Sequence, residues 1–309
     1  MDSARRDRLL RLLPCSARAL QPLAPLTTFR IGGPAQILAE PTSVREMVEV
    51  MRIVTAERVP RFYLGLGSNL LVSDAGFDGV VIRAGEELRR IELKDKHVCA
   101  GPGARLLDLT AFAAARSLSG MEALSGIPGS VGGGLYMNAG AYGSEIANTL
   151  VSVDVITADL RTVTLRRDEI GFSYRSAPAL ENAIIMESRY TLLPAQRLNI
   201  YAEMRRVWKL RRANQPLDYP SAGSVFKRPV GDYAGRLIEA VGGKGLRVGG
   251  ALVSPKHAGF IVNAGNASAA DVAALVRDVR KRVYETFQVR LEPEIRAVGF
   301  AEDPFAVAF

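Results

Sequence analysis

The sequence predicts an α+β protein of two or three domains. At about 150 residues per domain, its 309 residues correspond to two domains or to three small ones. Apolar residues recur at helical spacing between Val44 and Val54, whereas Val151, Val153 and Val155 alternate as in a half-buried strand. A hydrophobic share of 48% and a charged share of 23% are typical of globular chains and exclude extensive disorder.

The first expected unit combines helices with short strands around a glycine loop. Residues 1–26 are expected to form a short basic helix and then a proline-marked segment. A second helix begins at Ser43, where Glu46 indicates a capping box, and ends at Pro60. The expected strands Arg61–Leu64 and Val80–Arg83 lie on either side of the loop Gly65–Asn69.

The middle of the chain is rich in glycine. An alanine-rich helix is expected from Leu106 to Leu118. Eight of the 29 glycines follow within the 24 residues from Gly120 to Gly143. Such a permissive backbone indicates tight turns or close approach to a ligand. The strands expected after it are Val151–Val155, Thr162–Leu165 and Ala183–Leu192.

Two helices and a final strand are expected in the last third. A basic helix covers residues 200–213, and an amphipathic helix begins at Ser268 with Asp271 as its capping partner. The residues from Val289 to Val298 alternate as in a strand. Pro293 places that strand at a sheet edge or near its own end.

The composition indicates which kinds of binding partner and which cellular compartment to expect for the protein. The net charge of +8 favours anionic partners. Two histidines and two widely separated cysteines argue against a metal centre or a disulfide scaffold, and they fit a reducing cytoplasm. No stretch approaches the ~20 apolar residues of a membrane span, and no signal-type apolar core is present near the start.

Two glycine-rich segments are candidates for ligand contact. Gly65-Leu-Gly-Ser-Asn69 lacks the third glycine of the dinucleotide fingerprint, because Leu70 stands there, yet its N–H groups could form an anion-binding nest. The alternative is a plain tight turn. Ser125-Gly-Ile-Pro-Gly-Ser-Val-Gly-Gly133 and Asn138-Ala-Gly-Ala-Tyr-Gly143 suggest close ligand approach, with a packing loop as the alternative.

Two other motifs carry weaker signals. Ser224-Val-Phe-Lys227 has the Ser-x-x-Lys spacing of a serine nucleophile, but the chain lacks the Ser-Asp-Asn and Lys-Thr-Gly motifs of such enzymes. A serine that caps the start of a helix is the alternative. The basic run Arg205–Arg212 is typical of a solvated helix face, because only Trp208 supplies an aromatic side chain there.

Eight motifs in order resemble the UDP-N-acetylenolpyruvoylglucosamine reductase family. The resemblance runs from about residue 25 to residue 299, so it covers nearly the whole chain. Beyond the segments already quoted, it is carried by Thr27-Thr-Phe-Arg-Ile-Gly-Gly-Pro34, Tyr174-Arg-Ser176, Gly223-Ser-Val-Phe-Lys-Arg-Pro229, His257-Ala-Gly-Phe-Ile-Val-Asn263 and Leu291-Glu-Pro-Glu-Ile-Arg296.

The resemblance implies a flavoprotein with an FAD-binding fold of the vanillyl-alcohol-oxidase/PCMH type. Two α+β subdomains, residues 1–84 and 85–199, would hold FAD. Residues 200–288 would bind substrate, and the final strand within 289–309 would return to the second subdomain. NADPH would reduce the flavin, and UDP-N-acetylglucosamine enolpyruvate would then be reduced to UDP-N-acetylmuramate. The resemblance also implies a cytoplasmic enzyme, and we expect a monomer without nucleic-acid or membrane partners.

The resemblance also implies roles for individual residues. Ser224 would donate the proton, while Arg175 and Glu294 would stabilise an enolate-like intermediate. An ionised Glu294 would repel that intermediate, although Arg175 nearby favours ionisation. Tyr174, Arg211, Gln215 and Lys227 would bind substrate. The residues expected to bind FAD are Arg30, Gly65, Gly67, Ser68, Asn69, Leu70, Ser125, Gly126, Ile127, Pro128, Gly129, Ser130, Gly132, Gly133, Asn138, Gly140 and Ala141.

Three interpretations remain open on the sequence alone. The first is this reductase, of a shorter subtype, because no extra substrate loop is found between Tyr190 and Arg212. The second is another FAD enzyme of the same fold that oxidises alcohols or sugars. The third is a basic protein that binds nucleotides or nucleic acid without catalysis, in which Ser224, Arg175 and Glu294 would share no purpose.

Overall fold

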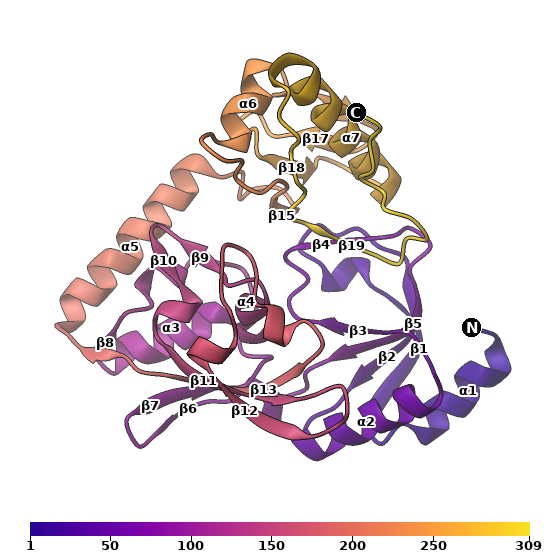
Figure 1. Cartoon of the computed structure of the whole chain (residues 1–309), viewed down its shortest axis with the longest axis vertical. Coiled ribbons are helices and arrows are strands. Elements are labelled where there is room, and N and C mark those ends of the chain that lie inside the picture. Colours follow the sequence, from indigo (N-terminus) through magenta and orange to yellow (C-terminus); the bar gives the residue numbers. More distant parts are fainter.

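The computed structural model describes residues 1–309 and contains three main sheets, of four, five and four strands. Their strands come from residues 16–83, 91–190 and 221–263 in turn. Figure 1 shows the third unit above the other two, with the long helix α5 (Arg197–Asn214) along one side. None of the helices is both long enough and apolar enough to cross a bilayer.

The first sheet has the strand order β1-β2-β5-β3, in which only the β1–β2 pair is antiparallel. Its strands are β1 (Ser16–Pro22), β2 (Pro34–Glu40), β3 (Arg61–Leu64) and β5 (Phe77–Arg83). Helices α1 (Ser3–Leu12) and α2 (Val44–Ala56) share one apolar core with this sheet. Ser43 caps α2 as predicted, but the capping box is incomplete, because the Glu46 carboxylate accepts the Thr42 N–H and not that of Ser43. Residues 1–26 hold a strand that the proline-marked segment did not suggest.

The second sheet is antiparallel and has the order β12-β11-β13-β7-β6. Its strands are β6 (Ile91–Lys94), β7 (His97–Ala100), β11 (Leu150–Ile156), β12 (Thr162–Arg166) and β13 (Ile184–Tyr190). Helix α3 (Leu106–Ala115) ends three residues before the predicted Leu118. Short elements complete the unit: β8 (Leu118–Ser119), α4 (Val131–Tyr136), β9 (Gly140–Ala141), β10 (Ser144–Glu145) and β14 (Leu193–Pro194).

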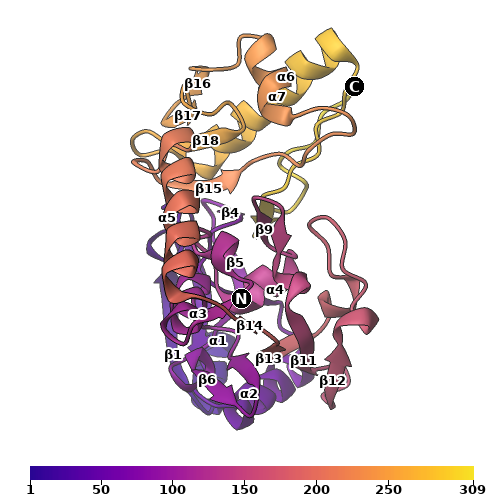
Figure 2. The ribbon, with the colours of Figure 1, turned by 90° about the vertical axis from the view of Figure 1, so that its left-hand side faces the viewer.

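The third sheet is antiparallel, with the order β15-β18-β17-β16, and two helices share its core. The strands are β15 (Ser221–Ser224), β16 (Arg247–Val248), β17 (Ala251–Val253) and β18 (Phe260–Asn263), and the helices are α6 (Ala234–Ala240) and α7 (Ala269–Phe287). The predicted capping box of α7 forms, because the side chains of Ser268 and Asp271 each accept the other's backbone N–H. Figure 2 shows α5 rising from the second unit to the third.

The C-terminal strand is shorter than predicted and pairs with a different unit from the one expected. Only β19 (Arg296–Val298) forms, and it pairs in parallel with β4 (Leu70–Val72) in the first unit, not with the second unit as expected. The residues before it lie against the third unit, where Pro293 forms an isolated bridge with Phe226. Proline has no N–H to donate, so a continuous ladder cannot run through this position.

The third unit is fastened to the first by hydrogen bonds and by a shared core. The Thr28 hydroxyl donates to the Ser221 carbonyl at 2.7 Å, and the Asn263 amide donates to the Phe29 carbonyl at 3.2 Å. The Phe29 side chain lies in the apolar core of α7. Asp74, in the loop after β4, accepts the first two N–H groups of α7 at 2.8 and 3.1 Å.

Replacing Asp74 by alanine should loosen this joint. Two N–H groups at a helix start lose a charged acceptor, which costs about 1 kcal/mol, or a fall of about 2 °C in the midpoint of thermal unfolding. The control is Asp218→Ala, at an exposed residue whose side chain makes no hydrogen bond within the protein. Equal midpoints for the two variants would contradict the capping role.

Candidate functional site

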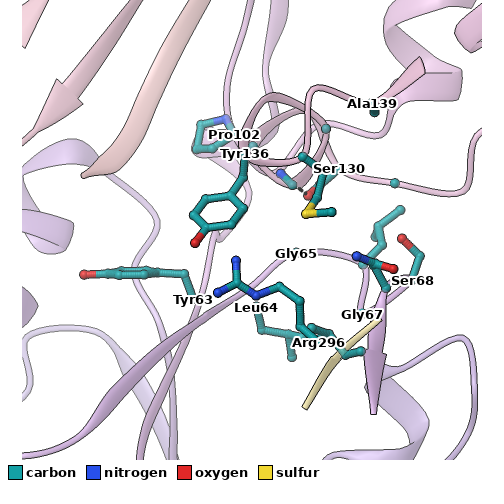
Figure 3. A pocket seen from close by; sticks show the side chains of 18 of the residues that line it. Tyr63, Leu64, Gly65, Gly67, Ser68, Pro102, Ser130, Tyr136, Ala139 and Arg296 are labelled. Atoms are coloured by element: carbon teal, nitrogen blue, oxygen red, sulfur yellow. Dashed lines mark hydrogen bonds between the residues drawn. The ribbon is translucent and has the colours of Figure 1, made fainter. Parts of the chain in front are cut away.

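A cavity of about 1280 Å³ is lined by residues of all three units. Its volume exceeds the ~300–1,000 Å³ of ordinary small-molecule pockets. The walls come from the β3–β4 loop, the turn before α3, the second glycine segment, the end of α5, β15 and the start of β19. Figure 3 shows the first glycine loop opposite Pro102, Ser130 and Tyr136.

The first glycine loop offers free backbone donors. None of the five N–H groups from Gly65 to Asn69 donates to a backbone carbonyl. Gly67 has a φ of +61°, and a Cβ on it would lie 2.4 Å from the Leu26 carbonyl oxygen. A Cβ on Gly65 would lie 2.2 Å from the Ser130 Oγ. The loop therefore has the properties of an anion-binding nest, and glycine is required at two of its positions.

The second glycine segment is used mainly for packing. The Gly132 N–H donates to the Pro102 carbonyl at 2.9 Å, and the Gly133 N–H donates to the Ser130 hydroxyl at 3.2 Å. The Leu106 N–H in turn donates to the Gly129 carbonyl at 2.8 Å. These bonds join the segment to the turn before α3, so most of its N–H groups are used within the protein, whereas those of Gly126 and Ser130 make no such bond.

The three residues expected to be catalytic converge in the cavity, although they are far apart in the sequence. The Arg175 Nε donates to the Glu294 Oε1 at 2.6 Å. The Glu294 N–H donates to the Val225 carbonyl at 2.7 Å, which holds Glu294 beside the end of β15, where Ser224 lies. Arg175 has a φ of +57°, so its loop keeps this residue in the left-handed region.

Glu294 is the titratable group whose surroundings bear most on chemistry. Its burial raises the pKa of the carboxyl, while the charges of Arg175 and Lys227 act in the opposite direction. The net shift is upward, so desolvation outweighs the two cations. A carboxyl that gains a proton more readily than usual suits a site where negative charge develops.

The serine-nucleophile hypothesis does not agree with the structure. Ser224 ends a strand, so Lys227 does not lie one helical turn away from it, and no helix begins at this serine for it to cap. The Lys227 ammonium instead forms an ion pair with the Glu292 carboxylate. A lysine held in this way is not placed to deprotonate the serine.

The C-terminal end of α5 contributes a buried cation to the cavity. Arg211 and Gln215, both expected to bind substrate, line it. Arg211 is 8% exposed, its Nε has no partner, and burial lowers its pKa. A Cβ on Gly126 would lie 2.3 Å from the Arg211 Cδ, so this glycine makes room for the arginine. The Gln215 Oε1 is also buried without a partner.

Some expected binding residues do not line the cavity. Tyr174 is half exposed and accepts a hydrogen bond from the Arg228 N–H at 3.3 Å. Asn138 is buried and donates to the Glu145 carboxylate at 2.8 Å and to the Ser173 carbonyl at 3.1 Å, so it braces the loop that carries Arg175. The other residues outside the lining are Arg30, Ser125, Gly126 and Lys227. The ligand roles of all six stay predictions.

The structure adds lining residues that the sequence did not single out. The Arg296 guanidinium lies 4.7 Å from the centre of the Tyr136 ring, and Figure 3 shows both near Tyr63 and the first glycine loop. Burial raises the pKa of Tyr63 to about 12. Arg296 lies two residues after Glu294 in the same motif. This spacing was the sequence signal that could have identified Arg296 as a cavity residue. Further additions are Arg83, Pro102, Gly103, Arg105, Thr157 and Asn182.

Comparisons with known proteins agree with this geometry. The profile of an FAD binding domain matches residues 35–166, and that of the UDP-N-acetylenolpyruvoylglucosamine reductase C-terminal domain matches residues 215–298. A solved reductase of this name from Thermus caldophilus has a TM-score of 0.80 and 38% identity, covering 92% of this chain and 98% of that one.

Curated relatives give the same result. The UDP-N-acetylenolpyruvoylglucosamine reductase of Latilactobacillus sakei is 43% identical, over 90% of this chain and 92% of the relative. A second, from Symbiobacterium thermophilum, is 47% identical over 93% of both chains.

The fold and the comparisons define an FAD-dependent oxidoreductase of the vanillyl-alcohol-oxidase/PCMH type, which confirms the predicted fold class. Within that class, the chain belongs to the UDP-N-acetylenolpyruvoylglucosamine reductase family.

Contact between the two glycine segments predicts the effect of one methyl group. Gly65→Ala should weaken FAD binding about tenfold or more, because its Cβ would press on the Ser130 Oγ and displace the loop. Adding Ser130→Ala removes that oxygen and should recover part of the affinity, since the Ser130 Cβ is 3.3 Å away. Titration of the apoproteins with FAD measures both effects. A double variant no better than Gly65→Ala would contradict the contact.

Proposed function

We propose that this chain reduces UDP-N-acetylglucosamine enolpyruvate to UDP-N-acetylmuramate, with FAD as cofactor and NADPH as electron donor. One observation carries the proposal: Ser224, Arg175 and Glu294 meet in a cavity that is also lined by the free N–H groups of the first glycine loop. A proton donor, a cation and a buried carboxyl are the groups that reduction of an enol ether requires. The names of the relatives supply the substrate class.

The residues around the first glycine loop fit FAD. Five consecutive free N–H groups suit a diphosphate, and the glycines leave no side chain between the loop and its neighbours. Arg296 adds a positive charge beside this loop. Bound FAD would supply the hydride that reduces the vinyl group. The protein's part is to hold the cofactor and to stabilise charge on the substrate.

The charge develops where Arg175 and Glu294 lie. Hydride addition at the terminal vinyl carbon leaves negative charge on the neighbouring carbon, and this charge spreads into the substrate carboxylate. Arg175 would bind that carboxylate, and electrostatic stabilisation of this kind is often the largest single term in catalysis. Ser224 would give its hydroxyl proton to the neighbouring carbon and regain one from solvent before the next turnover. The pairing of β15 with β18 and the φ of +79° at Gly223 set its position.

The nucleotide diphosphate of the substrate also needs cations. Arg211 is buried with an unsatisfied Nε, so an anion in the cavity would satisfy it. Gln215, which also lines the cavity, would add a polar contact, whereas substrate contacts from Lys227 and Tyr174 stay predictions. The expectations of a cytoplasmic monomer without nucleic-acid or membrane partners stay predictions.

The proposed function is tested with the purified holoenzyme under anaerobic conditions. NADPH should bleach the flavin absorption, and UDP-N-acetylglucosamine enolpyruvate should restore it with formation of UDP-N-acetylmuramate. UDP-N-acetylglucosamine, which lacks the vinyl group, should restore nothing. A reduced flavin that the enolpyruvate compound fails to reoxidise would contradict the proposed substrate.

Ser224→Ala should separate the two halves of the reaction. Flavin reduction by NADPH should keep its rate, while reoxidation by substrate should slow by about 10²–10⁴-fold through loss of the general acid. Stopped-flow absorption measures each half, so the first half serves as the control for folding and cofactor binding. Normal reoxidation in this variant would show that another group donates the proton.

A further inference from the structure

The Arg175–Glu294 pair is neutral as a unit and largely removed from water. The two side chains are 20% and 12% exposed, and they meet at 2.6 Å across 119 residues of sequence. The Glu294 backbone is fixed on both sides, because its N–H donates to the Val225 carbonyl and its own carbonyl accepts from the Asn69 amide at 3.1 Å. The carboxyl therefore cannot move far from the guanidinium.

Arg175 has donors left over. Only its Nε bonds a protein group, so both Nη groups remain available to a second carboxylate. The centre of the Tyr174 ring lies 5.0 Å from the guanidinium carbon, which is a cation–π contact. A substrate carboxylate can therefore bind Arg175 without first displacing Glu294.

The second cation that faces Glu294 is already engaged. Lys227, in the segment after β15, is ion-paired with Glu292. Arg296, on β19, lies over the Tyr136 ring. Of the charged groups around the carboxyl, Arg175 and Lys227 are the two that oppose its protonation. When a substrate carboxylate arrives, two carboxylates must share the charge of one guanidinium in a buried site.

We propose that Glu294 takes up one proton from solvent when the substrate carboxylate binds Arg175, and releases it when the product leaves. This inference rests on the proposed function. Like charges that share one partner raise each other's proton affinity, and here the substrate is fixed as the anion by the Nη groups. Burial already raises the pKa of Glu294, so the added charge acts in the same direction.

Protonation changes what Glu294 does in the reaction. As an anion it would repel the enolate-like state, whereas as an acid it donates a hydrogen bond to the substrate carboxylate. The proton that reaches carbon still comes from Ser224, and the proton on Glu294 is not consumed. The product keeps its carboxylate, so uptake and release balance over one turnover. Glu294 is thus protonated, and able to donate this hydrogen bond, only when a carboxylate ligand is bound.

Titration calorimetry of the oxidised holoenzyme tests this without turnover, because no reductant is present. Binding of UDP-N-acetylglucosamine enolpyruvate is measured near pH 7 in two buffers that differ in ionisation enthalpy. The expected result is uptake of close to one proton per substrate bound. UDP-N-acetylglucosamine, which lacks the carboxylate, should bind with no uptake. Binding of the enolpyruvate compound without proton uptake would overturn the inference and leave the proposed function standing.

Two variants test whether Glu294 is the group that takes up the proton. Glu294→Gln should abolish the uptake, whereas Glu285→Gln, at an exposed helix position, should preserve it. The flavin spectrum and binding of UDP-N-acetylglucosamine report whether each variant is intact. Uptake that persists in an intact Glu294→Gln variant would overturn the assignment.

The wild-type protein gives a further measurement that needs no variant. If one proton is taken up, the affinity for the enolpyruvate compound should fall by up to about tenfold for each unit of rising pH around neutrality. The affinity for UDP-N-acetylglucosamine should stay flat over the same range. Parallel profiles for the two compounds would overturn the inference. Failure of the enolpyruvate compound to bind at all would overturn the proposed function itself, and this inference with it.

Discussion

Hydrogen bonds hold residues 292–298 to two units at once, and the geometry of the site depends on this. The Glu294 N–H bonds to the third unit at the Val225 carbonyl, whereas the Arg296 N–H bonds to the first unit at the Asn69 carbonyl, 2.9 Å away. One short segment thereby places a carboxyl near Ser224 and a cation near the first glycine loop. Asn69 contacts both residues: its carbonyl accepts the Arg296 N–H, and its side-chain amide donates to the Glu294 carbonyl.

The buried ion pair is better understood through function than through stability. Removing two charges from water costs roughly as much as their attraction returns, so a buried pair contributes little to folding on balance. Arg175 and Glu294 nevertheless bring together a loop of the second unit and a segment fastened to the third. The pair keeps a cation with unused donors facing the cavity, and a ligand can then change the proton affinity of its partner.

Much of the local structure followed from the sequence, and the exceptions have physical reasons. The capping boxes and apolar spacing predicted α2 and α7, because those signals lie within a few residues of each other. The strand β1 was missed, since its burial pattern is mostly exposed and shows no regular alternation. The partner of β19 was predicted wrongly, because which unit a strand pairs with depends on residues far away in the sequence.

The sequence by itself determined the glycine loops, the capped starts of α2 and α7 and, through motif order, the family. Only the tertiary structure decided which donors remain free. Gly65–Asn69 and Ser125–Gly133 are both glycine-rich, but most N–H groups of the second segment donate to acceptors within the protein. Likewise, the raised pKa of Glu294 comes from desolvation by surrounding units and outweighs the neighbouring cations. Hydrogen-bond satisfaction and burial are sums over partners distant in sequence, so no local pattern contains them.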